Sequence, residues 1–270
     1  MWWLILIIMG VAILFLYCVS PALRQHPDAE LCKNLYAAHR GLHSLKDGIP
    51  ENSLAAIKKA VDLGYGIEID IHLTMDGEVV VFHDETLMRA CGINKRIKNT
   101  TYQELSKYEI FNTKEHIPTL SQVLEIIGGR TMLIIEFKCS DISYKKLCSA
   151  ANRILTDYKG KYIVQSFNPL AMLWYRKNRP DVCRGQLSTD FFRQPKINAL
   201  KAAAGLLMLN MISRPDFISY DIQYVNSFPR KICSFLGAIR AGWTVTSYDQ
   251  LRKISKNFDI YIFEGFLPDK

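Results

Sequence analysis

The chain has 270 residues, of which 49% are hydrophobic and 22% are charged, and its formal net charge is +8. This length and apolar content suffice for one substantial core, and no long linker, low-complexity tract or fixed-period repeat divides the chain. The seven cysteines are scattered without a C-x-x-C pair, which argues against a disulfide framework and favours a reduced compartment.

The first residues differ in composition from the rest of the chain. The run from Trp2 to Val19 is almost wholly apolar, and the first charged side chain is Arg24. A helix of this length can cross the ~30 Å hydrocarbon core of a bilayer, so we expect a transmembrane anchor. A cleaved signal peptide is the alternative, because Ser20-Pro-Ala22 offers small residues around a cut site. The length of the run and the absence of a preceding Lys or Arg favour the anchor.

Three regions follow from this composition: an anchor over 1–24, a linker over 25–34 and one folded domain over 35–270. Near the anchor, positive charge lies only on the C-terminal flank, as at Arg24 and Lys33, and the positive-inside tendency then places the domain in the cytoplasm. The basic excess would help the domain to lie against anionic lipid, although such an excess often serves solubility alone. We expect no nucleic-acid partner.

Strand-like and helix-like segments alternate from residue 35 onward. The predicted strands are 35–39, 66–72, 79–82, 132–137, 161–166, 183–187, 217–221, 242–246 and 259–263. The predicted helices are 50–64, 101–108, 120–127, 145–156, 170–177, 195–208, 229–240 and 248–256. Asp76-Gly77 favours a tight hairpin, because the connection around it is too short for a parallel crossover, so 79–82 extends the second strand in antiparallel direction. The other eight strands alternate with helices, which predicts a closed (β/α)8 TIM barrel. The long excursion from Glu85 to Pro118 is expected above the barrel mouth, where it would shape the site.

Glu68 and Asp70 lie two residues apart in a run where they alternate with Ile67, Ile69 and Ile71. Because residues i and i+2 of a strand point the same way, both carboxylates project from one face. Two neighbouring carboxylates on the core-facing side repel each other and lose hydration unless a cation or basic groups compensate them. A divalent ion held by oxygen ligands is one explanation, and two separate surface salt bridges are the other.

Further polar groups end other predicted strands. Glu136 and Lys138 share one face of their strand, His39 and Arg40 end another, and His83 ends the hairpin strand. In parallel α/β folds, ligands bind at the carboxyl ends of the strands. A lone histidine at such a place is usually structural, but this whole collection is hard to explain by packing. The pattern therefore favours a ligand site built around the carboxylates.

Seven short segments, in their order and spacing, resemble the glycerophosphodiester phosphodiesterase family. They are Ala38-His-Arg-Gly41, Pro50-Glu-Asn-Ser53, Ile67-Glu-Ile-Asp70, Thr74-Met-Asp-Gly77, Val80-Val-Phe-His-Asp84, Ile135-Glu-Phe-Lys138 and Gln165-Ser-Phe-Asn168. The C-terminal run from Trp243 to Pro268 is also similar to the family, so the resemblance covers residues 35 to 268. It implies a TIM barrel and metal-dependent hydrolysis of glycerophosphodiesters to glycerol 3-phosphate and an alcohol.

The resemblance also implies roles for individual residues. The metal ligands would be Glu68, Asp70 and Glu136, the acid/base pair His39 and His83, and the phosphate-binding cations Arg40 and Lys138. Hard oxygen ligands suit Ca²⁺ or Mg²⁺ better than zinc. Histidine suits acid/base work because its pKa lies near the working pH, and which histidine is the acid stays open. The attacking group is either water or the substrate's own glycerol hydroxyl.

Four positions carry less specific signals. Glu51 matches a family motif, yet a glutamate in the first turn of a helix is equally explained by the helix dipole. Trp243 corresponds to a family tryptophan near the substrate pocket and is equally explained by barrel packing. We expect His72 to be structural. The last strand ends with Glu264 and Gly265 where many relatives carry Thr-Asp, and we expect this departure to lie outside the core site.

Two other functions stay open. One is a phospholipase C or lysophospholipase D that acts on membrane phospholipids, which the anchor favours. The expected partners are therefore a small-molecule or lysolipid phosphodiester and the membrane itself. The other is a membrane-tethered binding protein without catalysis, which the presence of all the principal site residues disfavours.

Overall fold

The computed structural model describes residues 2–24, 26–139, 143–193 and 196–269. The strands in this part of the chain are β1 (Leu35–His39), β2 (Gly66–Leu73), β3 (Val79–Val81), β4 (Leu133–Phe137), β5 (Tyr162–Ser166), β6 (Arg184–Ser188), β7 (Phe217–Asp221), β8 (Ile239–Val245) and β9 (Ile260–Phe263). The α-helices are α1 (Trp2–Val19), α2 (Leu54–Asp62), α3 (Met88–Cys91), α4 (Tyr102–Leu105), α5 (Leu120–Ile127), α6 (Tyr144–Thr156), α7 (Pro169–Asn178), α8 (Ala199–Gly205), α9 (Asn210–Ser213), α10 (Phe228–Phe235) and α11 (Tyr248–Ile254). The 3-10 helices are η1 (Pro27–Cys32), η2 (Leu45–Asp47), η3 (Ile97–Asn99), η4 (Phe191–Arg193) and η5 (Ile222–Tyr224).

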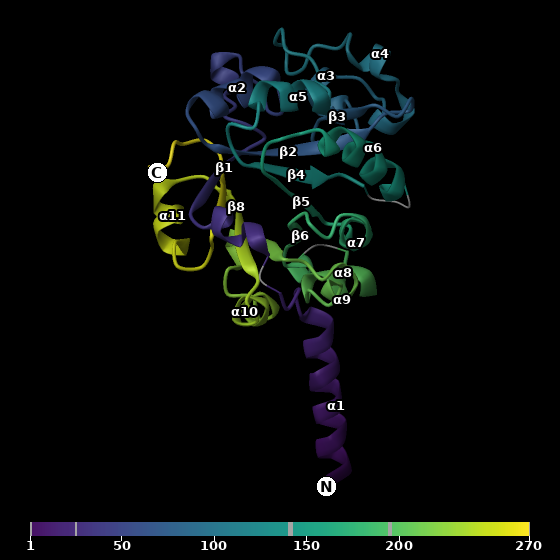
Figure 1. The fold of residues 1–270 in the computed structure, drawn as a ribbon, viewed down its shortest axis with the longest axis vertical. Helices are drawn as coiled ribbons and strands as arrows, with labels where there is room; N and C mark the ends of the chain where they lie inside the picture. Colours follow the sequence, from purple (N-terminus) through teal and green to yellow (C-terminus); the bar gives the residue numbers. More distant parts are fainter. Residues whose placement is uncertain (1, 25, 140–142, 194–195, 270) are drawn as a thin grey trace.

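Eight of the described strands form a closed parallel barrel. Their order is β1-β9-β8-β7-β6-β5-β4-β2, and β1 pairs with β2 to close the ring. β3 pairs with β2 in antiparallel direction, with Leu73 opposite Val79, as the hairpin prediction requires. The helices lie around the outside of the strands (Figure 1). The predicted (β/α)8 TIM barrel, with a hairpin after its second strand, is therefore confirmed.

Side chains along β2 point alternately to the outside and to the interior of the barrel. Ile67, Ile69 and Ile71 are completely buried and belong to the large core beneath the helices. Glu68 and Asp70 alternate with them, so these carboxylates face the barrel interior. The interior also holds an apolar cluster contributed by several strands, which contains Ala37, Ile134, Ile163, Cys183, Phe217, Ala241, Ile260 and Ile262. The two carboxylates thus share a largely apolar interior, in which charge is poorly solvated.

The excursion after β3 folds around a small core of its own. Val80, Phe82, Leu87 and Leu105 are buried in this cluster. Arg89 of α3 pairs with Glu51 and Asp84, so the excursion contacts residues that surround the mouth of the barrel. In Figure 1, α3 and α4 lie beyond β3 at the edge of the barrel.

Two predicted boundaries near the C-terminus are wrong. The helix predicted over 229–240 is α10, which ends at Phe235, and β8 begins at Ile239 instead of at 242. Gly237 reverses the chain at this point with φ of +90°, a conformation that glycine adopts without strain. The barrel then pairs Ile239 with Phe217, and this tertiary pairing outweighs the helical pattern of the segment.

The helix predicted over 195–208 is also shorter in the structure. Its described part is α8, which ends at Gly205, and a separate short helix, α9, follows it. Residue 195 itself lies outside the described residues.

Helix α1 extends away from the barrel, and the structure reproduces the predicted range Trp2–Val19 (Figure 1). It is long and apolar enough to cross a membrane, and of its residues only Cys18 and Val19 are buried. The backbone oxygen of Val19 accepts hydrogen bonds from Asn210 Nδ2 and Cys233 Sγ. The last turn of α1 therefore rests against α9 and α10.

The segment between α1 and β1 is ordered against the barrel. It contains η1, and Cys32 at the end of η1 is completely buried in the apolar interior cluster. Ala22 N–H donates to the backbone oxygen of Pro215, and Arg24 pairs with Asp216. The region predicted as a linker, 25–34, thus closes the amino-terminal end of the barrel over its described residues.

Candidate active site

The three predicted carboxylates meet inside the barrel at the carboxyl ends of β2 and β4. Glu68 and Asp70 come from β2 and Glu136 from β4, where Asp70 and Glu136 are register partners. All three are buried, and one oxygen of each lies within 4.8 Å of the others. These oxygens can hold a metal ion.

Two cations lie against this carboxylate group. Lys138 Nζ is 3.0 Å from Asp70 Oδ1 and 2.6 Å from Glu136 Oε1. Arg40 Nε is 3.4 Å from Asp70 Oδ2, and Arg40 Nη1 donates to Glu51 Oε1 at 2.8 Å. Three carboxylates thus face two cations, and one of these cations is shared with Glu51.

The pKa values reflect this imbalance. Burial, together with the charges of Asp70 and Glu136, raises the pKa of Glu68 well above its usual range. Burial and Asp70 also raise the pKa of Glu136 to about 7, against the opposing effect of Lys138. Burial would raise the pKa of Asp70 as well, but the charges of Lys138 and His83 outweigh it and lower that pKa. Three ionised carboxylates would outnumber their two cations, and the raised pKa values of Glu68 and Glu136 mean that protons offset this excess while no other cation is bound.

The two predicted histidines lie at the same end of the barrel. They line one cavity of about 150 Å³ together with Arg40, Glu68, Glu136, Lys138, Gln165, Phe167, Leu187, Trp243, Thr244 and Ile262. Each histidine has a carboxylate on its Nδ1: Glu264 Oε2 is 2.6 Å from His39 Nδ1, and Asp84 Oδ1 is 2.6 Å from His83 Nδ1. Burial lowers the pKa of His83, so this ring is neutral at pH 7. Because Nδ1 of each ring is engaged in this way, Nε2 is the nitrogen that could contact a ligand.

Comparison with known proteins agrees with this geometry. The model of the glycerophosphoryl diester phosphodiesterase family matches residues 39–212. The chain is 30% identical to a glycerophosphodiester phosphodiesterase of Caldanaerobacter subterraneus over 236 residues, which are 83% of this chain and 90% of the relative. The chain belongs to this family. Its members are phosphoric diester hydrolases.

Other relatives extend this comparison. A human lysophospholipase D is 37% identical over 153 residues, or 52% of this chain and 48% of the relative. A glycerophosphodiester phosphodiesterase of Thermotoga maritima has a similar structure, with a TM-score of 0.66 and 25% identity over 85% of this chain and 93% of that one. An Oleispira antarctica phosphodiesterase, solved with its product sn-glycerol-3-phosphate, shares the fold at 22% identity with a TM-score of 0.69, over 87% of this chain and 94% of that one.

The expectation that the family departure at Glu264 lies outside the core site is wrong. Glu264 Oε2 contacts His39 Nδ1 and lies 3.8 Å from His43 Nε2. The hydrogen bond from His39 and the nearby ring of His43 lower the pKa of Glu264, so it is ionised at neutral pH. β9 pairs with β1 in the closed barrel, with Ala38 opposite Phe263, and this pairing brings Glu264 beside His39.

Sequence reasoning also missed two polar residues beside the site. Asn52, inside the quoted motif Pro50-Glu-Asn-Ser53, is buried and donates through Nδ2 to Asp70 Oδ2 at 2.9 Å. Arg89 donates to Glu51, the partner of Arg40, and to Asp84, the partner of His83, and so links the excursion to the site. The family motif was the available signal for Asn52, whereas no signal in the sequence pointed to Arg89.

The remaining predicted positions are placed as follows. Trp243 lines the cavity and also packs against the interior cluster, so both of its proposed roles fit its position. Glu51 binds Arg40 and lies at the edge of the site. His72 is buried in β2, with Nε2 at 3.2 Å from the backbone oxygen of His83, which fits the structural role expected for it.

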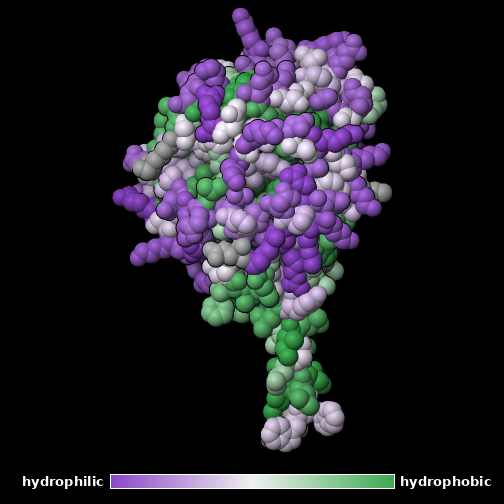
Figure 2. Space-filling model, in the orientation of Figure 1, coloured by the Kyte–Doolittle hydropathy of each residue, from purple (hydrophilic) through white to green (hydrophobic). Residues whose placement is uncertain are grey.

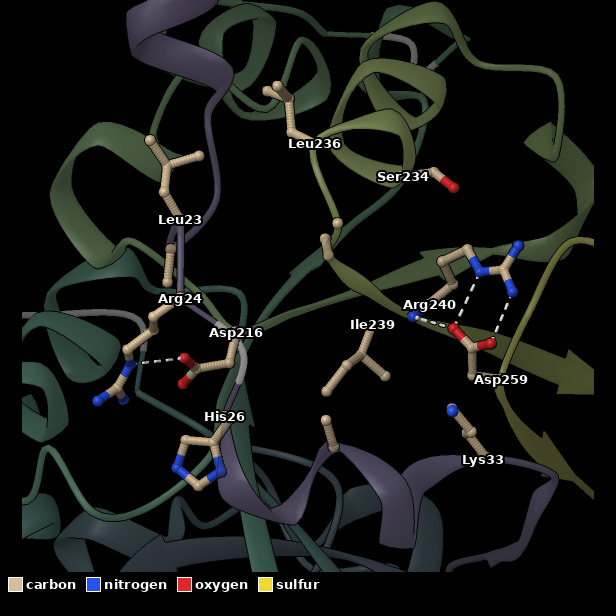
Figure 3. Close-up of a pocket in the computed structure, with 14 residues that line it drawn as sticks. Leu23, Arg24, His26, Lys33, Asp216, Ser234, Leu236, Ile239, Arg240 and Asp259 are labelled. Atoms are coloured by element: carbon tan, nitrogen blue, oxygen red, sulfur yellow. Dashed lines mark hydrogen bonds and ion pairs between the residues drawn. The ribbon is translucent and has the colours of Figure 1, made fainter.

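A larger cavity, of about 490 Å³, lies at the opposite end of the barrel (Figure 3). The segment after α1 forms one wall, and the residues around the start of β8 form the other. Arg24 pairs with Asp216 at 3.2 Å and Arg240 pairs with Asp259 at 2.6 Å. Because both of these acids have a cation of their own, this cavity lacks the excess negative charge of the carboxylate site.

Proposed function

We propose that the chain hydrolyses glycerophosphodiesters to glycerol 3-phosphate and an alcohol, in a reaction that requires a divalent cation. The observation that carries the proposal is the meeting of two histidines, two cations and two of the three carboxylates around one cavity. A phosphodiester brings a negative charge, an ester oxygen that departs as an alkoxide, and a phosphorus atom that an attacking hydroxyl must reach. The cavity offers a partner for each of them.

Glu68, Asp70 and Glu136 would hold the cation. Their oxygens are hard ligands that lie within 4.8 Å of one another, and the three carboxylates outnumber the two cations, Lys138 and Arg40. This donor set suits Ca²⁺ or Mg²⁺. When bound, such an ion supplies charge neutralisation at a phosphate oxygen and makes a nearby hydroxyl more acidic.

The remaining side chains would bind and orient the diester. Arg40 and Lys138 line the cavity and can donate to the phosphate oxygens, and the planar guanidinium group suits bidentate contact. Trp243 and Phe167, which pack edge to face, would form the apolar wall for the glycerol or alcohol portion.

His39 and His83 would move the protons. One histidine accepts the proton of the attacking hydroxyl, from water or from the substrate's glycerol, and the other protonates the departing alkoxide. The carboxylates of Glu264 and Asp84 on the Nδ1 atoms would fix each ring so that Nε2 does this work. The neutral state of His83 at pH 7 suits it to the role of base.

A lysophospholipid is a second candidate substrate, favoured by α1. We propose that α1 (Trp2–Val19) anchors the chain in a membrane and that the domain from residue 35 onward lies on the cytoplasmic side. A substrate held in a bilayer would then be within reach of the tethered enzyme. Recovery of a soluble protein that begins at or after Pro21 would contradict the anchor, because it would identify the helix as a cleaved signal peptide.

The proposed reaction is tested with full-length protein in detergent. Glycerophosphocholine and lysophosphatidylcholine are supplied separately, and the released glycerol 3-phosphate, choline and lysophosphatidic acid are measured. Glycerol 3-phosphate and choline are expected from the first substrate, and the His83→Ala variant should release both ~10²–10⁴-fold more slowly. Release of phosphocholine instead would place the cleavage on the other side of the phosphate and would contradict the proposal.

A further inference from the structure

Helix α10 presents an apolar face to solvent. Phe228 is 68% exposed and Phe235 is 89% exposed, and Lys231 between them is exposed as well. Positions i, i+3 and i+7 lie on one side of a helix, so these three side chains form one face. We call it the α10 face. Two large aromatic side chains are seldom left this exposed on one face of a short helix that contacts only water.

The α10 face is continuous with the end of α1. Cys233 of α10 donates through Sγ to the backbone oxygen of Val19, and Met211 of α9, which is 41% exposed, lies with Sδ 3.5 Å from Cys18 Sγ. Figure 2 shows the hydrophobic surface of α1 continuing onto the underside of the domain at the place where Figure 1 draws α10. A bilayer that surrounds α1 would therefore reach α10.

The helices that form this surface carry charges of one sign, although Asp190 lines the groove beside Phe228. The segments 2–24, 199–214 and 226–240, which include α1, α8, α9 and α10, contain no Asp or Glu. They carry Lys231, Arg214 and other basic residues, and Arg214 lies over the ring of Tyr17 at 4.4 Å while it donates to the backbone oxygen of Ser20. Exposed aromatic side chains among basic residues are typical of surfaces that bind anionic lipid.

The same surface leads toward the catalytic cavity. Phe228 and Phe192 line a groove of about 400 Å³ between η4 and the start of α10. Phe191, the neighbour of Phe192, packs edge to face against Phe167, which lines the catalytic cavity. A membrane beneath the α10 face would thus lie beside the rim of the site.

We propose that the α10 face docks on the surface of a bilayer that contains anionic phospholipid, with Phe228 and Phe235 inserted among the headgroups. This docking would hold the rim of the site at the headgroup layer, where a lipid-borne diester is found. The inference rests on the proposed anchoring role of α1. It does not depend on the residues assigned to the reaction.

Tryptophan fluorescence in vesicles tests the proposal. Full-length Phe228→Trp and Phe235→Trp variants are reconstituted in vesicles of phosphatidylcholine and phosphatidylserine whose acyl chains carry bromine, a quencher. The wild-type emission is subtracted from that of each variant. Met75→Trp is the matched control, because Met75 is 62% exposed on the hairpin after β2. Bromine should quench the added tryptophan at 228 and at 235 but not at 75.

The native residues Trp2 and Trp3 report separately on α1, since they lie at its far end. If bromine quenches the wild-type emission but not the tryptophan added at 228 or 235, the docking proposal is wrong and the proposed anchoring by α1 stands. No quenching of the wild type would overturn both. Self-association that Phe235→Ser abolishes, without quenching at 228 and 235, would assign the face to a second copy of the chain and would also overturn the proposal.

The rate on lipid gives a second measurement. In the Phe228→Ser/Phe235→Ser double variant, hydrolysis of lysophosphatidylcholine held in vesicles should fall about tenfold, the scale expected when two apolar anchors are lost. Hydrolysis of soluble glycerophosphocholine should stay unchanged. An unchanged rate on vesicles would contradict docking even if the proposed reaction is correct.

Discussion

The two ends of the barrel differ in how their buried acids are paired with cations. At the amino-terminal end, Asp216 is buried between Arg24 and Arg184, and Asp259 is paired with Arg240. At the carboxyl end, three buried carboxylates share two cations, and the pKa of Glu136 is raised to about 7. Paired charge can support a fold, whereas excess buried charge costs stability. The comparison indicates that the carboxyl end is arranged for a ligand at the expense of stability.

The largest expected effect is on the reaction rate at the carboxyl end. His39→Ala and His83→Ala should each lower kcat by ~10²–10⁴-fold, the usual contribution of a general acid or base. KM should change far less, because Arg40 and Lys138 remain to bind phosphate. Steady-state kinetics on glycerophosphocholine measure both constants. His116→Ala, which removes an exposed ring that donates through Nδ1 to the backbone oxygen of Tyr108, serves as the control. A near-native kcat for either cavity histidine would refute its acid/base role.

At the amino-terminal end the expected effect is on stability. Asp216→Ala would leave Arg184 buried without its partner, so the free energy of unfolding should fall by about 3–5 kcal/mol. Urea denaturation measures this change, and kcat of the folded fraction should stay native. Asp249→Ala, which breaks an exposed ion pair with Arg252, should leave the free energy of unfolding nearly unchanged. An Asp216→Ala protein with native stability would remove the contrast between the two ends.

Substitution of Glu264 should have a smaller effect on kcat. Glu264→Gln weakens a charge-assisted hydrogen bond to His39, which is worth ~1.5–3 kcal/mol, so kcat should fall roughly 10–100-fold. The pH dependence of kcat should shift as well, because the charge beside His39 is lost. Glu30→Gln, at an exposed ion pair near the other end, is the control. If the pH profile and kcat both stay native, Glu264 does not position His39.

The smallest expected effect is the pH dependence of stability that Glu136 contributes. Its pKa rises from 4.5 to about 7 on folding, so the folded state binds the proton more tightly. Between about pH 4.5 and 7 this residue should therefore make the protein less stable as pH rises. The difference between the unfolding free energies of wild type and Glu136→Gln, measured in chelator across this range, isolates the contribution. A difference that stays constant with pH would contradict the raised pKa.

Most of the fold could be predicted from the sequence, because the alternation of apolar and polar residues and the lengths of the connections between strands are local features. The run around Glu68 and Asp70 indicates a two-faced strand, and Asp76-Gly77 indicates the hairpin that keeps β3 out of the barrel. The end of α10 could not be placed in the same way. There the pairing of β8 with β7 decides the boundary, and this pairing exists only in the folded chain.

Which residues come together in the candidate site could be predicted only in part. Glu68, Asp70 and Glu136 end strands whose carboxyl ends converge in any parallel barrel, so their meeting follows from the predicted fold. Glu264 lies far from His39 in sequence, and Arg89, although it follows His83 closely, belongs to the excursion. Their contacts depend on the pairing of β1 with β9 and on the path of the excursion after β3, neither of which has a local signal.

The central claim is that the excess negative charge at the carboxyl end holds a divalent cation required for the reaction. The most direct measurement is the rate of glycerophosphocholine hydrolysis in EDTA, followed by the return of Ca²⁺ or Mg²⁺. We predict no activity in the chelator, recovery with one of these ions, and a weakened metal response in Glu68→Gln with the fold intact. Full activity in EDTA would contradict the claim.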